Sequence, residues 1–408
     1  MSVIELSLSG LAYGGEAFGR DHDGRMIFVP FALPDELVRV EIVEEHKRWA
    51  RARLLEVLES SPSRTEPRCL HFRECGGCHY QHIPYDLQLE FKTAILRDQL
   101  KRIGGFEDVS IDPMIPSPDP WNYRNRVKFS LTDDGALGFV DQSGAHVFKI
   151  QECHLPEPEI LNITAAIDLP TTATMSAIEI RTGIEGERMV IFHGEDDPNI
   201  DLAVEQPDSI VWLGDSGTIV LAGENYIFIK VHEKYFRISA TAFFQVNTSQ
   251  INRLVDLVIQ VLNPKSDEVI FDLYAGVGLF SAFIAERGAR LSAVEESPSA
   301  CLDFEHNLNK FENVALYEAT VEATMGAIHP RPDAVVLDPP RSGLSRDALD
   351  AIVEQKPERI IYVSCDPATL ARDGKRLHLA NYNLDTVTPI DLFPQTYHIE
   401  SVSRWYRT

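Results

Sequence analysis

The first 60 residues follow the alternating pattern of half-buried β-strands. Val38, Val40 and Ile42 alternate with polar neighbours, and the short apolar runs over 26–31 and 37–43 are separated by loops rich in glycine. Successive side chains of a strand point to opposite faces, so this pattern predicts strands that bury one face in a core. Residues 1–60 are therefore predicted to form a small β domain.

The middle of the chain combines one long helical pattern with many short strands. Apolar residues recur at helical spacing over Tyr85–Gly105, and the run ends in a pair of glycines, which is typical of a helix stop. Short apolar runs then alternate with turns over 130–240, beginning with a strand over 127–131. These patterns predict a β-rich, antiparallel central domain over residues 61–240.

From about residue 241 the pattern changes to strands that alternate with helices. A helix is predicted over 249–262, and strands over 289–295 and 332–337. Such alternation is typical of a parallel, doubly wound α/β sheet, so residues 241–408 are predicted to form a Rossmann-like domain. The runs Thr386–Ile390 and Thr396–Tyr406 predict a terminal hairpin.

Charge and composition limit the classes of function. The chain has 44% hydrophobic and 25% charged residues, as ordinary globular proteins do, and a net charge of −24. This charge argues against a simple nucleic-acid binder. However, residues 151–230 hold 3 basic against 15 acidic residues, which is a net of −12 and half of the excess. No apolar stretch is long enough for a membrane span and no signal peptide is recognised, so a cytoplasmic protein is expected.

Two clusters combine basic and aromatic residues. They are His46–Arg53, around Trp49, and Trp121–Lys128, which runs into a predicted strand. Basic side chains can follow a phosphate backbone while an aromatic ring stacks on a base. A solvated surface or a plain strand edge explains the same residues equally well.

Four cysteines form a spaced group. Cys69, Cys75 and Cys78 have the spacing C-x5-C-x2-C, and Cys153 follows later in the chain. Without a secretory signal, disulfides are not expected, so a metal becomes the main hypothesis. Four thiolates suit zinc or an iron–sulfur cluster. Because structural zinc usually takes two close cysteine pairs, the spacing favours a four-iron, four-sulfur cluster, with zinc or free thiols as alternatives.

A glycine-rich turn in the C-terminal domain predicts a nucleotide-like cofactor. A strand ends at Asp272 and is followed by Gly276-x-Gly278 and a helical run, so the backbone can approach a ligand closely. The next predicted strand ends in Glu295, where a carboxylate accepts hydrogen bonds from ribose hydroxyls. The third glycine of dinucleotide binders is missing, which favours S-adenosylmethionine over NAD.

The stretch Ile361–Asp366 predicts a buried strand that ends at Pro367, with a helix over 368–379. Ligands of open α/β sheets bind beyond the carboxyl ends of the strands, which is where Cys365 lies. A buried, inert cysteine is the alternative interpretation. For Glu400, which lies among apolar residues, the alternative is a surface ion pair with Arg404.

Five motifs follow one another along the chain in the order known from one enzyme family. They are Gln245-Val-Asn247, Asp272–Gly278, Asp338-Pro-Pro-Arg341, Ser364-Cys-Asp366 and His398-Ile-Glu400. With the glycine-rich loops and the basic run of the N-terminal region, the chain resembles the RNA uracil-5-methyltransferases. It resembles especially the branch that acts on 23S rRNA and has a four-iron cluster and a TRAM domain. The resemblance implies that residues 1–60 are this TRAM domain, an OB-like β-barrel that binds RNA.

The resemblance implies roles for individual residues. Cys365 would be the nucleophile and Glu400 the base, while the four cysteines named above would hold the cluster. S-adenosylmethionine would contact Gln245, Tyr274, Gly276, Gly278, Glu295 and Asp338. The expected partner is RNA, with rRNA favoured over tRNA, and the expected state is a monomer.

Two other functions stay open at this point. Asp338-Pro-Pro-Arg also resembles the loop of amino-group methylases, which need no nucleophilic cysteine, so another RNA atom could be the target. A non-catalytic, cluster-bearing RNA-binding protein would explain residues 1–160 but would leave the cofactor motifs without a purpose.

Overall fold

The computed structural model describes residues 2–166, 175–195 and 209–408. The chain divides into two compact units that do not follow sequence order. Unit 1 comprises residues 1–98, 139–154 and 393–398, and unit 2 comprises residues 99–138, 155–392 and 399–408. The predicted domain boundaries at residues 60 and 240 stay a prediction.

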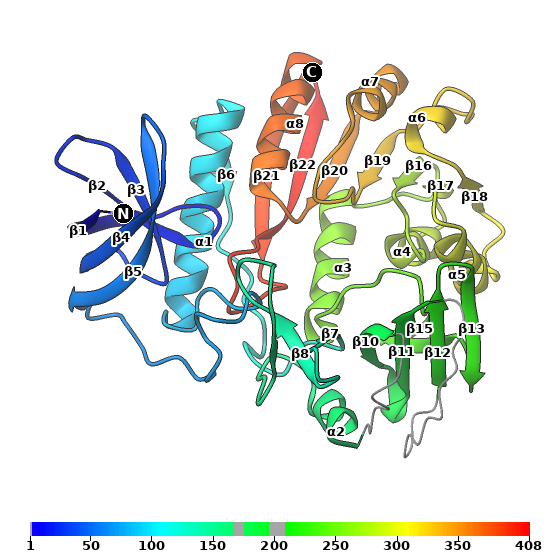
Figure 1. Ribbon diagram of the computed structural model, residues 1–408. Coiled ribbons are helices and arrows are strands. Elements are labelled where there is room, and N and C mark those ends of the chain that lie inside the picture. The colour runs from blue at the N-terminus through cyan, green and yellow to red at the C-terminus, as the bar shows by residue number, and fades with distance from the viewer. Residues whose placement is uncertain (1, 167–174, 196–208) are drawn as a thin grey trace. The chain divides into compact units, whose positions relative to one another are not determined.

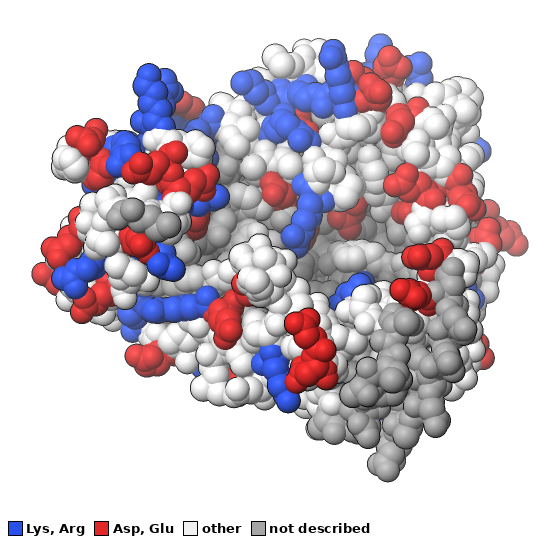
Figure 2. Space-filling model, in the orientation of Figure 1, with Lys and Arg blue, Asp and Glu red and all other residues white. Residues whose placement is uncertain are grey.

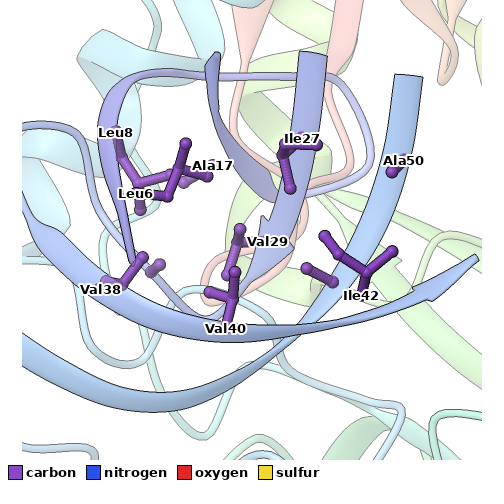
Figure 3. Packing of buried hydrophobic residues seen from close by; sticks show 11 residues of the cluster. Leu6, Leu8, Ala17, Ile27, Val29, Val38, Val40, Ile42 and Ala50 are labelled. Atoms are coloured by element: carbon purple, nitrogen blue, oxygen red, sulfur yellow. The ribbon is translucent and has the colours of Figure 1, made fainter. Parts of the chain in front are cut away.

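The N-terminal strands close into a barrel of order β1-β2-β3-β5-β4 (Figure 1). The strands are β1 (Val3–Leu11), β2 (Glu16–Arg20), β3 (Met26–Pro30), β4 (Leu37–Glu45) and β5 (Trp49–Glu59). The apolar side chains that alternate along them meet inside the barrel and form its core (Figure 3). At Gly19 a Cβ atom would lie 2.2 Å from the Ser7 carbonyl oxygen, so β1 and β2 approach too closely there for any other residue.

The rest of unit 1 is built around helix α1 (Tyr85–Gln99). The predicted helix continues for one π-turn over Leu100–Gly104 and stops at Gly105, whose φ of 80° requires glycine. Segment 393–398 is fixed on α1 by buried polar groups. Gln88 Nε2 donates to Gln395 Oε1 at 3.0 Å, and the buried Lys92 donates from Nζ to the Phe393 carbonyl oxygen at 3.0 Å.

The central sheet has the order β13-β12-β11-β10-β7-β8-β9. Its strands are β7 (Arg126–Leu131), β8 (Leu137–Val140), β10 (Met175–Thr182), β11 (Arg188–Gly194), β12 (Ser209–Gly214) and β13 (Gly217–Ala222). The short strand β9 (Val147–Lys149), helix α2 (Pro158–Ala166) and a separate hairpin of β14 (Tyr226–Val231) and β15 (Lys234–Ser239) complete this region. The predicted β-rich region is confirmed, but β11 and β12 pair in parallel, so the sheet is mixed.

The C-terminal sheet has the order β18-β17-β16-β19-β20-β22-β21-β6. Its strands are β6 (Ser110–Ile111), β16 (Val269–Leu273), β17 (Arg290–Glu295), β18 (Val314–Glu318), β19 (Ala334–Leu337), β20 (Arg359–Ser364), β21 (Tyr382–Ile390) and β22 (Glu400–Arg407). Its helices are α3 (Thr248–Leu262), α4 (Leu279–Glu286), α5 (Pro298–Leu308), α6 (Val321–Thr324), α7 (Arg346–Gln355) and α8 (Pro367–Leu379). In Figure 1, α8 lies beside β21 and β22, and it contacts β21.

This order confirms the predicted doubly wound fold. Strands β16 to β20 are parallel, and the chain runs outward from β16 in one direction through β17 and β18 and in the other through β19 and β20. Such a reversal is where open α/β sheets bind ligands, beyond the carboxyl ends of the strands. The predicted terminal hairpin is β21–β22, although its second strand begins at Glu400 rather than Thr396.

No helix in the described ranges is long and apolar enough to cross a membrane.

Candidate active site

The turn after β16 brings backbone groups to the switch point of the sheet. Gly276 has a φ of 54° and Gly278 a φ of 90°, and a Cβ at Gly278 would lie 2.3 Å from the Leu308 side chain. The Gly276 N–H donates to Glu295 Oε2 at 2.8 Å. The two predicted features of this edge, the glycine turn and the acid that ends β17, are therefore joined directly.

A cavity of about 420 Å³ opens beside this turn, within the range of small-molecule sites. It is lined by Tyr274, Val294, Glu295, Glu296, Ala319, Thr320, Val321, Glu322, Pro340, Ser342, Gly343, Leu344, Ser345 and Arg372. Among the residues predicted for the cofactor, only Tyr274 and Glu295 belong to this lining. Several others come from the end of β18 and from α8, which the cofactor motifs did not point to.

Two aspartates lie at the ends of the adjacent strands β16 and β19. Asp272 is fully buried, and its Oδ2 accepts from Ser281 Oγ at 2.6 Å, whereas its Oδ1 has no hydrogen-bond partner among the described residues. Burial raises the pKa of Asp272 to about 7. Burial, together with the charge of Asp272, raises the pKa of Asp338 to about 7. An unpartnered buried carboxylate oxygen is what a cationic or hydrogen-bonding ligand would satisfy.

Cys365 follows the last residue of β20 directly. Ser364, the last residue of β20, pairs with Ser401 of β22, so Cys365 and Glu400 both adjoin this last pair, at the same end of the two strands. Opposite residues of an antiparallel pair have Cβ atoms roughly 5 Å apart. Residues 35 positions apart in the sequence therefore meet at one edge of the sheet.

The electrostatics of this cluster agree with close contact. Burial, together with the carboxyl groups of Glu400 and Asp338, raises the pKa of the Cys365 thiol to about 12, while Arg341 opposes them. Glu400 is 3% exposed, and burial followed by Asp338 raises its pKa well above the ordinary value, again opposed by Arg341. Both groups therefore hold their protons more tightly than they would in water.

The alternative interpretation of Glu400 as a surface ion pair is wrong. Arg404 instead forms an ion pair with Asp385 on the neighbouring strand β21. Arg341, in contrast, was not predicted as a site residue, although it is the basic group acting on both Cys365 and Glu400. The position after the two prolines of the Asp-Pro-Pro-Arg motif was the signal for it.

Gln245 lies in the loop between β15 and α3, and its backbone is held firmly. Asn125 Nδ2 donates to the Gln245 carbonyl oxygen at 3.2 Å and to Thr248 Oγ1 at 3.0 Å. The side chain of Gln245 is buried, and the contacts of the described residues do not join it to the cavity or to Cys365. Its predicted cofactor role stays a prediction.

The four predicted metal ligands all lie in unit 1. Two hydrogen bonds join the segment before Cys153 to the one that follows Cys69: Gln151 N donates to His71 Nε2 at 2.9 Å, and Leu70 N donates to a Glu152 carboxylate oxygen at 2.5 Å. Within the described ranges, no three His, Cys, Asp or Glu side chains form a group that could hold a metal ion. The two segments are therefore held together, but the described residues do not form a metal site there.

Most arginines of the two basic clusters have acidic partners. On the barrel, Arg51 pairs with Glu16 and Arg53 with Glu41, while Trp49 stacks on His46 with ring centroids 4.0 Å apart. Figure 2 shows basic and acidic side chains intermixed over the barrel. In the second cluster, Tyr123 is buried and Arg126 pairs with the buried Glu179. Neither cluster is a simple basic patch.

Family models match two parts of the chain. One described as a TRAM domain matches residues 1–55, and one described as tRNA (Uracil-5-)-methyltransferase matches residues 219–405. An uncharacterized RNA methyltransferase of Halalkalibacterium halodurans is 34% identical over 98% of this chain and 96% of its own length. Another, of Aquifex aeolicus, is 34% identical over 98% and 97%.

A solved structure is similar over the whole chain. It is the crystal structure of Pyrococcus abyssi tRNA (uracil-54, C5)-methyltransferase in complex with S-adenosyl-L-homocysteine. The TM-score is 0.77, with 27% sequence identity, and the match covers 98% of this chain and 100% of the other.

Proposed function

The chain belongs to the RNA uracil-5-methyltransferases, which use S-adenosylmethionine, and we propose that it methylates C5 of one specific uridine through a covalent bond to Cys365. The observation that carries this proposal is that Cys365 and the buried Glu400 adjoin the last pair of β20 and β22, and that the Glu400 carboxyl acts on the pKa of the thiol. Amino-group methylation would need neither group. A non-catalytic RNA-binding protein, the other alternative, is wrong for a member of this enzyme family.

The cavity beside Gly276 is the proposed cofactor site. Its volume fits a nucleoside, and Glu295 keeps lone pairs for ribose hydroxyls beyond its bonds to backbone N–H groups. Tyr274 would line the ligand, Gly276 and Gly278 would allow its close approach, and Gln245 and Asp338 would contact its methionine end. When bound, S-adenosylmethionine supplies the methyl group and a positive charge at sulfur.

The chemistry follows from the electronics of uracil, whose C5 is a poor nucleophile. The Cys365 thiolate adds to C6, the C5=C6 electrons move toward the C4 carbonyl oxygen, and C5 becomes nucleophilic. After methylation C5 still carries its proton. Glu400 as carboxylate takes that proton, the C5–H electrons restore the C5=C6 bond, and the C6–S bond breaks to release the thiolate.

In this mechanism Cys365 acts as a thiolate and Glu400 as a carboxylate, so each group must lose its proton before it acts. The thiol and the Glu400 carboxyl hold their protons tightly, since burial and neighbouring carboxyl groups raise both pKa values. Positive charge lowers the pKa of both groups, as Arg341 already does. We therefore place Arg341 in the site as the residue that favours the thiolate and the Glu400 carboxylate.

Two RNA classes are candidates for the substrate. The sequence motifs favour a uridine of 23S rRNA, whereas the similar Pyrococcus abyssi structure is of a tRNA enzyme. The barrel, which matches the TRAM domain, would help to grip either one. We propose a monomer that works in the cytoplasm, where both RNA classes are found.

A direct assay tests the reaction and its substrate. Purified enzyme with methyl-labelled S-adenosylmethionine should label one uridine, as 5-methyluridine, in either unmodified 23S rRNA or unmodified tRNA. Nuclease digestion and mass mapping then locate the base. Label recovered on adenosine, guanosine or cytidine would overturn the proposal.

We also propose that Cys69, Cys75, Cys78 and Cys153 hold a four-iron, four-sulfur cluster. Four thiolates are the donor set that such a cluster needs, and the hydrogen bonds of His71 and Glu152 already join the segments of the first and last ligands. Burial raises the pKa of Cys69, so binding iron would release a proton there.

The cluster proposal predicts a defined composition. Protein purified without oxygen should contain about four iron and four sulfide per chain, as this cluster type requires. Cys78→Ala should lose most of both, whereas Cys301→Ala, which removes a buried thiol in unit 2, should keep them. One zinc per chain with no sulfide would show that the site is a zinc site instead.

A further inference from the structure

One wall of the cavity is a loop without regular structure. Residues Pro340–Ser345 connect Asp338, at the end of β19, to α7, and five of the six line the cavity. Within the loop the Gly343 N–H donates to the Pro340 carbonyl oxygen at 2.8 Å, and bonds from a neighbouring element add to this one. Those bonds come from two consecutive residues of α8, Arg372 and Asp373.

Asp373 is fully buried, and its side chain holds the loop by bonding to the backbone of Leu344. Its Oδ2 accepts from the Leu344 N–H at 2.8 Å and from the Tyr362 hydroxyl at 3.0 Å, and its Oδ1 accepts from Arg372 Nε at 2.9 Å. A buried carboxylate is costly unless it is paired and hydrogen-bonded, so packing alone would favour an apolar residue here. Here the carboxyl group meets a backbone donor of the cavity wall.

Arg372 completes the contact from the other side. Its Nη2 donates to the Ser342 carbonyl oxygen at 2.8 Å and to that of Leu344 at 3.3 Å, and its side chain lines the cavity. Between these two anchors, Gly343 has a φ of 71°, and a Cβ there would lie 2.5 Å from Asp373 Oδ2. The loop backbone therefore lies directly on the Arg372–Asp373 pair.

The helix that carries this pair begins at the proposed nucleophile. Asp366 follows Cys365 and caps α8, accepting from Ala368 N at 2.9 Å and Thr369 N at 2.8 Å. We propose that Arg372 and Asp373 are positioning residues that hold the 340–345 wall in the shape that binds S-adenosylmethionine. One helix then sets the cofactor wall relative to Cys365. This inference rests on the proposed function, because it takes the cavity as the cofactor site.

The sharpest test is Asp373→Asn. The amide keeps the size of the carboxylate but turns one oxygen into an N–H donor, which must face either the Leu344 N–H or Arg372. Losing a charged hydrogen bond of this kind should weaken S-adenosylhomocysteine binding by about 10- to 100-fold, measured by calorimetry. The KM for S-adenosylmethionine should rise in parallel, while kcat at saturating cofactor stays near the wild-type value.

Three further variants separate positioning from folding and from a wrong site. Arg372→Met, at a side chain 47% exposed, should fold normally and also raise KM. Lys375→Ala, an exposed position of the same helix, should change neither constant. Tyr362→Phe removes the hydroxyl of β20 that donates to Asp373 and leaves the bond from Leu344 in place. If this variant loses as much cofactor affinity as Asp373→Asn does, the bond that matters is the one to the strand and not the one to the loop.

The outcomes also distinguish this inference from the proposed function. If Glu295→Ala loses cofactor affinity while Asp373→Asn and Arg372→Met bind normally, the cofactor site stands and the positioning role is wrong. If Glu295→Ala also binds normally, the cavity is not the cofactor site. If Asp373→Asn instead lowers both kcat and the melting temperature while KM is unchanged, Asp373 serves the folding of the protein and not the shape of the cavity.

Discussion

Cys365→Ala should abolish RNA methylation, with a loss on the order of 10⁴-fold or more, as when other covalent nucleophiles are removed. Binding of S-adenosylmethionine should persist, because Cys365 does not line the cavity beside Gly276. Methyl transfer is followed with labelled cofactor, and cofactor binding is followed by calorimetry. Substantial methylation of uridine by this variant would mean that Cys365 is not the nucleophile.

RNA that contains 5-fluorouridine at the target position gives the positive counterpart. The wild type should form a stable covalent complex, since fluorine cannot leave C5 as a proton does. Cys365→Ala should form none. Cys301→Ala is the matched control, because Cys301 is a thiol of the same unit whose pKa burial also raises to about 12. It should be trapped as the wild type is.

The raised thiol pKa adds a dependence on pH. With a pKa of about 12, roughly one Cys365 in 10⁵ is a thiolate at pH 7, and this fraction grows tenfold per pH unit. Alkylation of Cys365 by iodoacetamide in the free enzyme should therefore accelerate steadily from pH 6 to pH 9, as read by mass spectrometry. A rate that levels off near pH 7 would mean that the resting site already favours the thiolate.

The parts of the site that could be predicted are those encoded within a few residues. A β-branched run that stops at an acid or a cysteine marks a strand end, and a glycine pair marks a close turn, so Glu295, Gly276 and Cys365 were placed correctly at the sheet edge. These signals need no knowledge of tertiary contacts. They follow from local backbone preferences and from the rule for strand ends.

The parts that could not be predicted depend on partners far along the chain. Glu400 is buried because β22 pairs in one particular register with β20, which lies about 35 residues earlier in the chain. A shift of this register by one residue would turn the side chain to the opposite face of the sheet. Arg372 and Asp373 look like an ordinary charged pair on a helix until Leu344 is brought beside them. The barrel arginines suggested a basic patch because their acidic partners come from other strands.

Glu400→Gln should stall the reaction after methyl transfer rather than before it. Gln keeps the shape of the side chain, and Glu400 is buried at the same end of the two strands as Cys365, so addition to C6 and methylation of C5 should still occur. The amide cannot accept the C5 proton, and the C6–S bond then cannot break. Turnover should fall by roughly 10²- to 10⁴-fold, the usual contribution of a general base.

The expected product is a methylated covalent adduct with ordinary uridine RNA. It should run as a slow band on a denaturing gel and carry label from the methyl group of the cofactor, approaching one RNA per enzyme. The raised pKa of Glu400 supports this role, since a carboxylate whose proton is held more tightly is a stronger base. Asp385→Asn, which removes an acid of the adjacent strand and its ion pair with Arg404, should turn over normally and leave no adduct.

Two results would remove Glu400 from the role of base. Normal turnover by Glu400→Gln would show that another group takes the proton. Slow turnover without labelled adduct would move the defect to a step before methylation, so that the carboxyl would serve to position the uracil instead. A double variant, Cys365→Ala with Glu400→Gln, is the control for the predicted adduct, because any adduct formed through Cys365 must vanish in it.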